Sequence, residues 1–185
     1  MGNGFDLGRV HTVAFCSRAR YGELILNLIA RIERLLSIIS PRNRFDWIEG
    51  GLAIGTDSAS PAVLKASGVT SIVSVGSRFR GEVSSFEVLY LDIKDHMPPS
   101  AEQASTAAEW ISTRLRNGQR VFVHCHAGMG RSVTLVTYYL MSRGKSLQEA
   151  IGLVRSRHRQ SSPTNSQLRF LRESEARFMK SRPPG

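Results

Sequence analysis

The pattern of apolar and polar positions changes once along the chain. From Tyr21 to Ile39, apolar residues recur three and four positions apart, which predicts an amphipathic helix that ends before Pro41. After residue 44, short apolar runs alternate with turn residues, as is typical of strands. The predicted strands occupy residues 52–55, 69–75, 83–93 and 120–124.

Segments of helical composition lie between and after these strands. They span residues 61–67, 101–115, 133–141, 146–154 and 163–178. Ser146 is followed three positions later by Glu149, which is the pattern of an N-terminal capping box, and Gly144 supplies the preceding stop. Strands that alternate with helices predict an α/β fold with a central, mainly parallel sheet flanked by helices.

Length and composition limit the chain to one catalytic domain with a modest appendage. A chain of 185 residues, of which 41% are hydrophobic, can fill one sizeable core. We divide it into an N-terminal extension that carries the amphipathic helix (residues 1–44), a domain (residues 45–180) and a frayed tail (residues 181–185).

The formal net charge of +10 suggests attraction to polyanions, but the distribution of the charge changes that interpretation. The excess of lysine and arginine lies in residues 1–44 and 141–185, whereas residues 45–140 are close to neutral. Nucleic acid is therefore not an expected partner. The predicted helix over residues 21–39 has arginines on its polar face, so it could contact a membrane surface peripherally, the domain itself or a partner protein.

Two cysteines, Cys16 and Cys125, cannot build a disulfide framework. A reducing compartment therefore fits better, and we expect a cytoplasmic protein, with membrane association left open for residues 21–39. The charge-free stretch at residues 24–30 is far shorter than the roughly 18 to 20 apolar residues of a membrane span. Each cysteine must then be explained as a thiol.

The chemically informative segment is residues 121–132, with the sequence VFVHCHAGMGRS. An apolar strand runs into a glycine-containing loop and then into a helix, an anion-binding geometry because backbone N–H groups and the helix N-terminus converge. Gly128 and Gly130 permit the backbone turns that such a loop needs. Cys125 at the base of the loop would be favoured as a thiolate nucleophile, and the planar guanidinium of Arg131 can grip two phosphate oxygens. The segment predicts a phosphate cradle with a nucleophile at its base.

With these residues, the sequence resembles the protein tyrosine phosphatase superfamily and, within it, the compact dual-specificity phosphatases. The resemblance covers about residues 45–178: it includes the signature loop, residues 45–53, residues 68–73 as the first strand of the sheet, and the segment Asp95-His96-Met97-Pro98-Pro99. It implies a protein phosphatase that hydrolyses phosphotyrosine and phosphoserine or phosphothreonine through a phosphocysteine intermediate. It implies neither a metal nor another cofactor.

The resemblance also implies roles for individual residues. Asp95, in the segment that looks like the family's acid loop, would protonate the leaving oxygen; Asp92 is the rival, although it lies in an alternating run typical of a strand. Ser132 would donate a hydrogen bond to the Cys125 sulfur, and His124 would bond the backbone near the loop and support its shape. Phosphate binding is expected from the loop residues His126, Ala127, Gly128, Met129, Gly130 and Arg131.

The roles of several other polar residues stay open. Downstream, either Asn165, Gln167 or neither positions the hydrolytic water. His124, Cys125 and His126 are not expected to bind a metal, because alternate strand residues face opposite sides and no second ligand pair has zinc spacing. Five arginines either add charge at the rim of the cleft or simply face solvent: Arg78, Arg80, Arg155, Arg157 and Arg159.

Two other functions compete with a protein phosphatase. The first is a phosphatase for a non-protein phosphate, such as a phosphoinositide or an RNA 5′ end; the loop carries His126 and Met129 instead of the lysines typical of phosphoinositide-directed relatives, which argues against a lipid. The second is a phosphate-binding scaffold without turnover, which the joint presence of Cys125, Arg131 and Asp95 argues against. The chain before Cys125 is also too short for the deep pocket of large tyrosine-specific domains, so we expect a shallower cleft.

Overall fold

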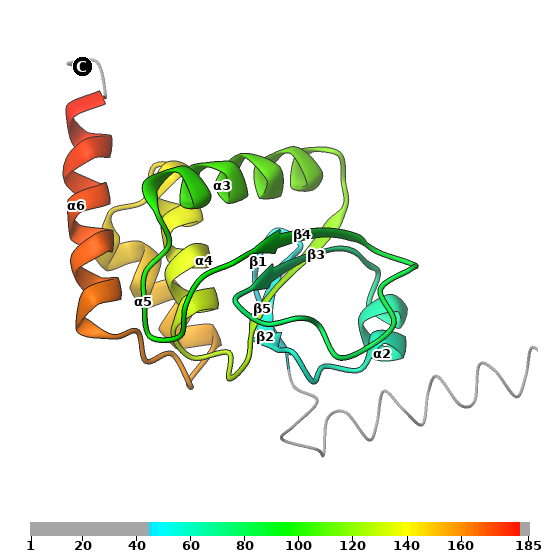
Figure 1. The fold of residues 1–185 in the computed structure, drawn as a ribbon. Coiled ribbons are helices and arrows are strands. Elements are labelled where there is room, and N and C mark those ends of the chain that lie inside the picture. Colours follow the sequence, from blue (N-terminus) through cyan, green and yellow to red (C-terminus); the bar gives the residue numbers. More distant parts are fainter. Residues whose placement is uncertain (1–44, 182–185) are drawn as a thin grey trace, which may run out of the picture.

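A five-stranded sheet lies at the centre of residues 45–181, the part of the chain that the computed structural model describes (Figure 1). In spatial order the strands are β1 (Phe45–Glu49), β2 (Leu52–Thr56), β5 (Arg120–Cys125), β3 (Val69–Val75) and β4 (Glu87–Leu91). β2, β5, β3 and β4 pair in parallel, and β1 is antiparallel to β2. The predicted mainly parallel sheet is confirmed, whereas the helix predicted over residues 21–39 lies outside the described residues.

The strands differ from the prediction at two places. The apolar pattern predicts no strand over residues 45–49, but β1 forms there because Gly50 and Gly51, both at positive φ, turn the chain back along β2. Residues 68–73, expected as the first strand, therefore contribute to the third strand along the chain. Of the apolar run over residues 83–93, only Glu87–Leu91 form a strand, β4. The first residues of the run belong to the preceding loop and pack, partly buried, against the sheet.

Five helices lie within the described residues: α2 (Pro61–Ala66), α3 (Ala101–Arg116), α4 (Arg131–Ser142), α5 (Leu147–Arg157) and α6 (Asn165–Ser181). The predicted capping box is confirmed at the start of α5, where Ser146 N donates to Glu149 Oε2 at 2.8 Å and Glu149 N donates to Ser146 Oγ at 3.3 Å. Ser181 ends α6, and residues 182–185 lie outside the described residues. No helix between residues 45 and 181 combines the length and apolar composition of a membrane span.

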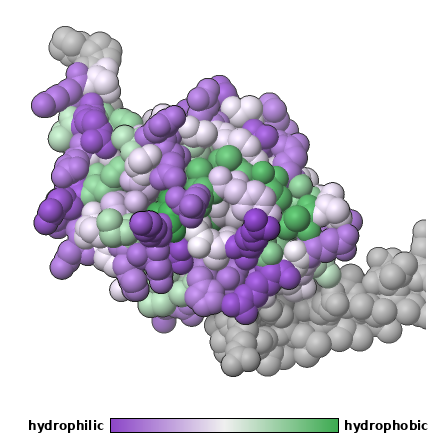
Figure 2. Space-filling model, viewed as in Figure 1, coloured by the Kyte–Doolittle hydropathy of each residue, from purple (hydrophilic) through white to green (hydrophobic). Residues whose placement is uncertain are grey.

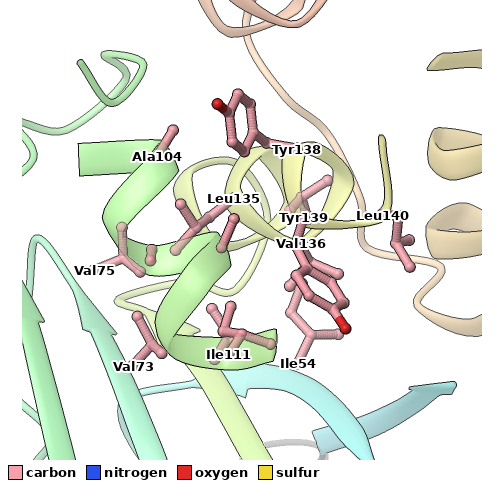
Figure 3. Close-up of a cluster of buried hydrophobic side chains, with 14 of the residues drawn as sticks. Ile54, Val73, Val75, Ala104, Ile111, Leu135, Val136, Tyr138, Tyr139 and Leu140 are labelled. Carbon is pink, nitrogen blue, oxygen red and sulfur yellow. The ribbon is translucent and has the colours of Figure 1, made fainter. Parts of the chain in front are cut away.

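The two faces of the sheet are covered unequally. Helices α3 to α6 pack on one face, where Ile54, Val73 and Val75 of the strands gather with Ile111 of α3 and Leu135 of α4 (Figure 3). The outer surfaces of α3 and α6 are mostly hydrophilic (Figure 2). The opposite face carries a smaller core beneath α2 and the loop after β3, which contains Ala53, Ala59, Leu64, Val69, Ile72, Phe79 and Phe122. Every α4 residue from 131 to 141 is buried, so the end of β5 and the start of α4 have a rigid base.

His124 is a polar side chain buried beside this smaller core. It is fully buried in β5, stacks on Phe122 with ring centroids 5.6 Å apart, and has its Nε2 atom 2.7 Å from Ser74 Oγ on β3. The side chain thus bonds a neighbouring strand's hydroxyl, while the support of the loop backbone expected from the sequence stays a prediction. Burial, which outweighs the opposing charge of Asp57, lowers the pKa of His124 from its ordinary 6.5 to about 4.

This lowered pKa predicts a loss of stability in mild acid. Between pH 6.5 and pH 4, His124 is protonated in the unfolded chain but stays neutral in the folded chain. The free energy of unfolding therefore decreases as the pH falls through this window. At 1.36 kcal/mol per pKa unit, the decrease approaches about 3 kcal/mol at pH 4. Urea unfolding across this range should show a flatter pH dependence for His124→Gln than for the wild type. His96→Gln, which changes an exposed histidine, should keep the wild-type slope; an unchanged slope in His124→Gln would contradict the assignment.

Candidate active site

Cys125 ends β5, the central strand of the sheet, and the loop of residues 126–130 leads from it into α4. Four parallel strands end at this same edge, which is where ligands bind in open α/β sheets. A cleft of about 350 Å³ opens over the loop. Its lining residues come from three segments of the chain: Asp95, His96, Cys125, His126, Ala127, Met129, Gly130, Arg131, Ser162, Pro163, Thr164 and Gln167.

The loop keeps its shape through a required glycine and a buried histidine. Gly128 has a φ of +70°, and a Cβ atom there would lie 2.8 Å from the carbonyl oxygen of Gly55, so no larger residue fits. His158 Nε2 donates to the Gly128 carbonyl at 2.8 Å, and His158 Nδ1 lies 2.6 Å from Asp46 Oδ2 on β1. The sequence assigns His158 no role, but the structure makes it the support of the loop.

Arg131 is buried, and backbone carbonyls fix its guanidinium. Nη1 donates to the carbonyl of Gly76 at 3.0 Å and to that of Ile93 at 3.1 Å. Gly76 follows β3 at a φ of +65°, and a Cβ atom there would lie 2.1 Å from Arg131 Nη1. The second terminal nitrogen, Nη2, lies 3.1 Å from Asp95 Oδ1. The guanidinium therefore has one end anchored to the protein and the other end at the cleft.

The two candidate acids occupy different places. Asp95 lines the cleft with Cys125 and is 67% exposed; its Oδ1 atom also accepts a hydrogen bond from His96 N at 3.0 Å. Asp92 is also exposed, but it lines a separate hollow together with Tyr90 and Ser77. The geometry therefore brings Asp95, and not Asp92, to the nucleophile's cleft.

Two further polar side chains complete the site: one from α4 lies beside the Cys125 sulfur, and one from α6 lines the cleft. Ser132 Oγ lies 3.3 Å from Cys125 Sγ, within hydrogen-bond distance for sulfur, and both residues are buried. Gln167 is fully buried; its Oε1 atom accepts from Thr164 N at 2.9 Å, and its Nε2 atom donates to the carbonyl of Met97 at 3.1 Å. Asn165, the other candidate for positioning water, is exposed and lies outside the cleft lining.

Asp57, just after β2, is a site residue that no motif in the sequence singles out. Its carboxylate is only 5% exposed and is 2.9 Å from His126 Nδ1 and 3.3 Å from Arg80 Nε. Its backbone N–H donates to the Cys125 carbonyl at 3.0 Å. Arg80 is thus paired with Asp57 and lies beside His126, a lining residue of the cleft, but does not itself line it. The remaining candidate arginines are also exposed and outside the cleft lining: Arg78, Arg155, Arg157 and Arg159.

Within residues 45–181, no group of three or more histidine, cysteine, aspartate or glutamate side chains has the arrangement of a metal site. His124 is enclosed beside Ser74, whereas His126 faces Asp57.

The cleft provides a thiol at the base of a loop, the N-terminus of α4 behind it, a guanidinium at one side and a carboxyl at the mouth. Such a set can bind a tetrahedral oxyanion and transfer a phosphoryl group.

Comparison with known proteins agrees with this chemistry. The family described as "Dual specificity phosphatase, catalytic domain" matches residues 53–177. The chain is 30% identical over 164 residues to dual specificity protein phosphatase 1 of Arabidopsis thaliana, covering 84% of this chain and 83% of the relative. It is 34% identical over 140 residues to dual specificity protein phosphatase 26 of Homo sapiens, covering 70% and 66%.

Solved structures show the same fold. A crystal structure of a mouse putative dual specificity phosphatase, complexed with zinc tungstate, superposes with a TM-score of 0.70 at 25% identity and covers 76% of this chain and 91% of that chain. The active form of Tk-PTP gives a TM-score of 0.61 at 32% identity, covering 74% and 98%. The chain belongs to the dual specificity phosphatase family and is a cysteine-dependent protein phosphatase.

Proposed function

We propose that this phosphatase works in two steps, with Cys125 as the nucleophile, Asp95 as the acid and Arg131 as the phosphate clamp. The observation that carries the proposal is the single cleft in which Cys125, Asp95 and the cleft-facing end of Arg131 converge, although 30 positions separate Asp95 from Cys125 in the sequence. No other described cleft combines a thiol with an arginine and a carboxyl group.

In the first step, the Cys125 thiolate attacks phosphorus in line with the leaving oxygen. The amides of residues 126–131, the N-terminus of α4 and Arg131 Nη2 stabilise the three equatorial oxygens, where the charge of the transferring group resides. Asp95, at the mouth of the cleft, protonates the leaving oxygen as the bond to phosphorus breaks. The products of this step are the dephosphorylated residue and a phosphocysteine.

In the second step, water attacks the phosphocysteine, and Asp95, now a carboxylate, removes its proton. Ser132, 3.3 Å from the sulfur, donates a hydrogen bond that stabilises the departing thiolate. Gln167 positions the water, since its amide lies at the cleft between the loop that carries Asp95 and the start of α6. Free phosphate and the original thiolate are regenerated.

The proposed substrates are phosphotyrosine, phosphoserine and phosphothreonine in proteins. The cleft is small, and the half-exposed Met129 lines it as a flexible apolar contact that suits both aromatic and aliphatic leaving groups. The family matches favour a protein phosphatase over a phosphoinositide or RNA phosphatase and over an inactive scaffold. A cytoplasmic location, and peripheral contact of residues 21–39 with a membrane or a partner protein, stay predictions from the sequence.

The nucleophile and the acid are tested by substitution. Cys125→Ser should abolish hydrolysis of an aryl phosphate, because a serine hydroxyl is not ionised near neutral pH and is a much weaker nucleophile than a thiolate. Asp95→Asn should lower kcat by roughly 10²–10⁴-fold, the usual contribution of a general acid. The matched control is Asp92→Asn, which should hydrolyse the aryl phosphate at close to the wild-type rate. Turnover that survives Cys125→Ser, or an Asp92→Asn variant that loses more activity than Asp95→Asn, would overturn these assignments.

Gln167 is proposed to act only in the second step, so its substitution should slow that step alone. In Gln167→Ala, the first turnover of an aryl phosphate should stay fast while the steady-state rate falls. The phosphocysteine forms normally, but its hydrolysis is slow because the water is poorly positioned. Rapid-quench measurement should then show a burst of product that the wild type lacks. Asn165→Ala should show no burst. Equal slowing of the first and later turnovers would instead mean that Gln167 acts through the Asp95 loop.

Gly76 tests how far catalysis depends on the Arg131 anchor. In Gly76→Ala the new methyl group would collide with the guanidinium, so we expect at least tenfold weaker inhibition by phosphate and a similar fall in kcat/KM, equivalent to about 1.4 kcal/mol. Gly118→Ala is the control: its φ is +74°, but no atom lies within 4 Å of the new Cβ, so both variants carry the same backbone cost of about 1–2 kcal/mol. Equal inhibition constants in the two variants would contradict the anchor.

A further inference from the structure

Asp57 is a buried carboxylate that the two-step mechanism does not use. It is 5% exposed, yet both of its oxygens have partners: Oδ1 is 3.3 Å from Arg80 Nε, and Oδ2 is 2.9 Å from His126 Nδ1. Burying a charge is costly unless it is paired and hydrogen-bonded, so these two partners are required for the carboxylate to lie where it does. The same carboxylate therefore fixes two side chains that come from different parts of the chain.

Arg80 and His126 lie side by side as a result, and we call these two side chains, held by Asp57, the Arg80–His126 lip. Arg80 Nη2 lies 3.5 Å from His126 Nδ1, and the His126 ring lines the catalytic cleft. Arg80 N also donates to the carbonyl of Asp57 at 3.1 Å, so the backbone of the loop after β3 is attached at the same point. The lip thus places a guanidinium beside the residue that directly follows the nucleophile.

The lip exposes the Arg80 guanidinium and buries the carboxylate that holds it. The side chains of Arg80 and His126 are 63% and 60% exposed, whereas the Asp57 oxygens lie beneath them. A guanidinium has five N–H donors, and Asp57 engages Arg80 through Nε, so the donors of the two terminal nitrogens lie outside that ion pair. Because the side chain is already held, a ligand that binds it loses less rotamer entropy than it would at a freely moving arginine.

We propose that the Arg80–His126 lip binds the carboxylate of an acidic residue close to the phosphorylated residue of a protein substrate, and that Asp57 is the positioning residue of this subsite. The proposal rests on the proposed function, because the lip adjoins the cleft in which the phosphorylated residue would bind. Arg80 supplies the positive charge, and the His126 ring beside it positions the guanidinium at the edge of the cleft. The structure thereby predicts a preference among phosphopeptides that a small aryl phosphate cannot reveal.

The same loop provides a matched control. Arg78 is two residues away from Arg80 and is also exposed, but it lines the separate hollow with Tyr90 and Asp92, whereas the ion pair with Asp57 is made by Arg80. Arg78→Gln removes the same charge from the same loop without touching the lip. A general electrostatic attraction to acidic peptides would depend on both arginines, whereas a built subsite depends on Arg80.

The experiment compares phosphopeptides that carry glutamate or glutamine at each of the two positions on either side of the phosphorylated residue. For the wild type, kcat/KM should favour glutamate at one of these positions by roughly tenfold, which corresponds to about 1.4 kcal/mol. Arg80→Gln and Asp57→Asn should both abolish this ratio, mainly through KM, while Arg78→Gln keeps it. The ratio should also shrink as the salt concentration rises, because the contact is solvent-exposed.

The control substrate separates the failure of this subsite from the failure of the proposed function. Hydrolysis of an aryl phosphate by Arg80→Gln should remain near the wild-type rate. If that hydrolysis is normal but the wild type shows no preference for glutamate, or Arg80→Gln retains the preference, the lip is not a subsite and the proposed function stands. If Cys125→Ser still hydrolyses the aryl phosphate, the proposed function itself fails. Should Asp57→Asn not fold, the comparison of Arg80→Gln with Arg78→Gln decides the question alone.

Discussion

The active site depends on a buried guanidinium that backbone carbonyls hold in place. Arg131 is 6% exposed, and a cation at that depth is tolerated only where its donors are satisfied. The carbonyls of Gly76 and Ile93, which follow β3 and β4, satisfy Nη1 and leave Nη2 at the cleft. The parallel sheet is what brings these two carbonyls to the same edge as the loop, so the clamp on phosphate is a property of the fold and not of one segment.

The rest of the edge supports the loop in a similar way. His158 reaches the Gly128 carbonyl from the end of α5, and Asp57 reaches the Cys125 carbonyl and the His126 ring from the end of β2. α4, buried along almost its whole length, fixes the residues that follow the loop. Hydrogen-bond donors held in advance of binding stabilise a developing charge without reorganisation, which is the largest contribution that a site of this kind makes to catalysis.

The parts of this protein that the sequence predicted are those that a short segment encodes. The nucleophile, the glycines and the arginine lie within residues 125–131, and the strand and helix on either side follow from local hydrophobic patterns. The supports could not be predicted, because their contacts are distant in sequence: 69 positions separate Asp57 from His126, and 112 separate Asp46 from His158. β1 was missed for a related reason, since an edge strand of five residues with one buried side chain has a weak apolar pattern. Gln167 and Asn165 look alike in the sequence, and only the packing of α6 distinguishes the buried amide from the exposed one.

The central claim is that phosphate passes through the Cys125 sulfur, and trapping the intermediate tests it most directly. The enzyme would be mixed with an aryl phosphate that carries radiolabelled phosphorus, quenched in acid within the first turnover, digested and mapped by mass spectrometry. We predict label on the peptide that contains Cys125, bound through sulfur as S-phosphocysteine, and no label on Cys125→Ser. Label on another residue, or complete hydrolysis with no labelled protein at any quench time in both the wild type and Gln167→Ala, would contradict the mechanism.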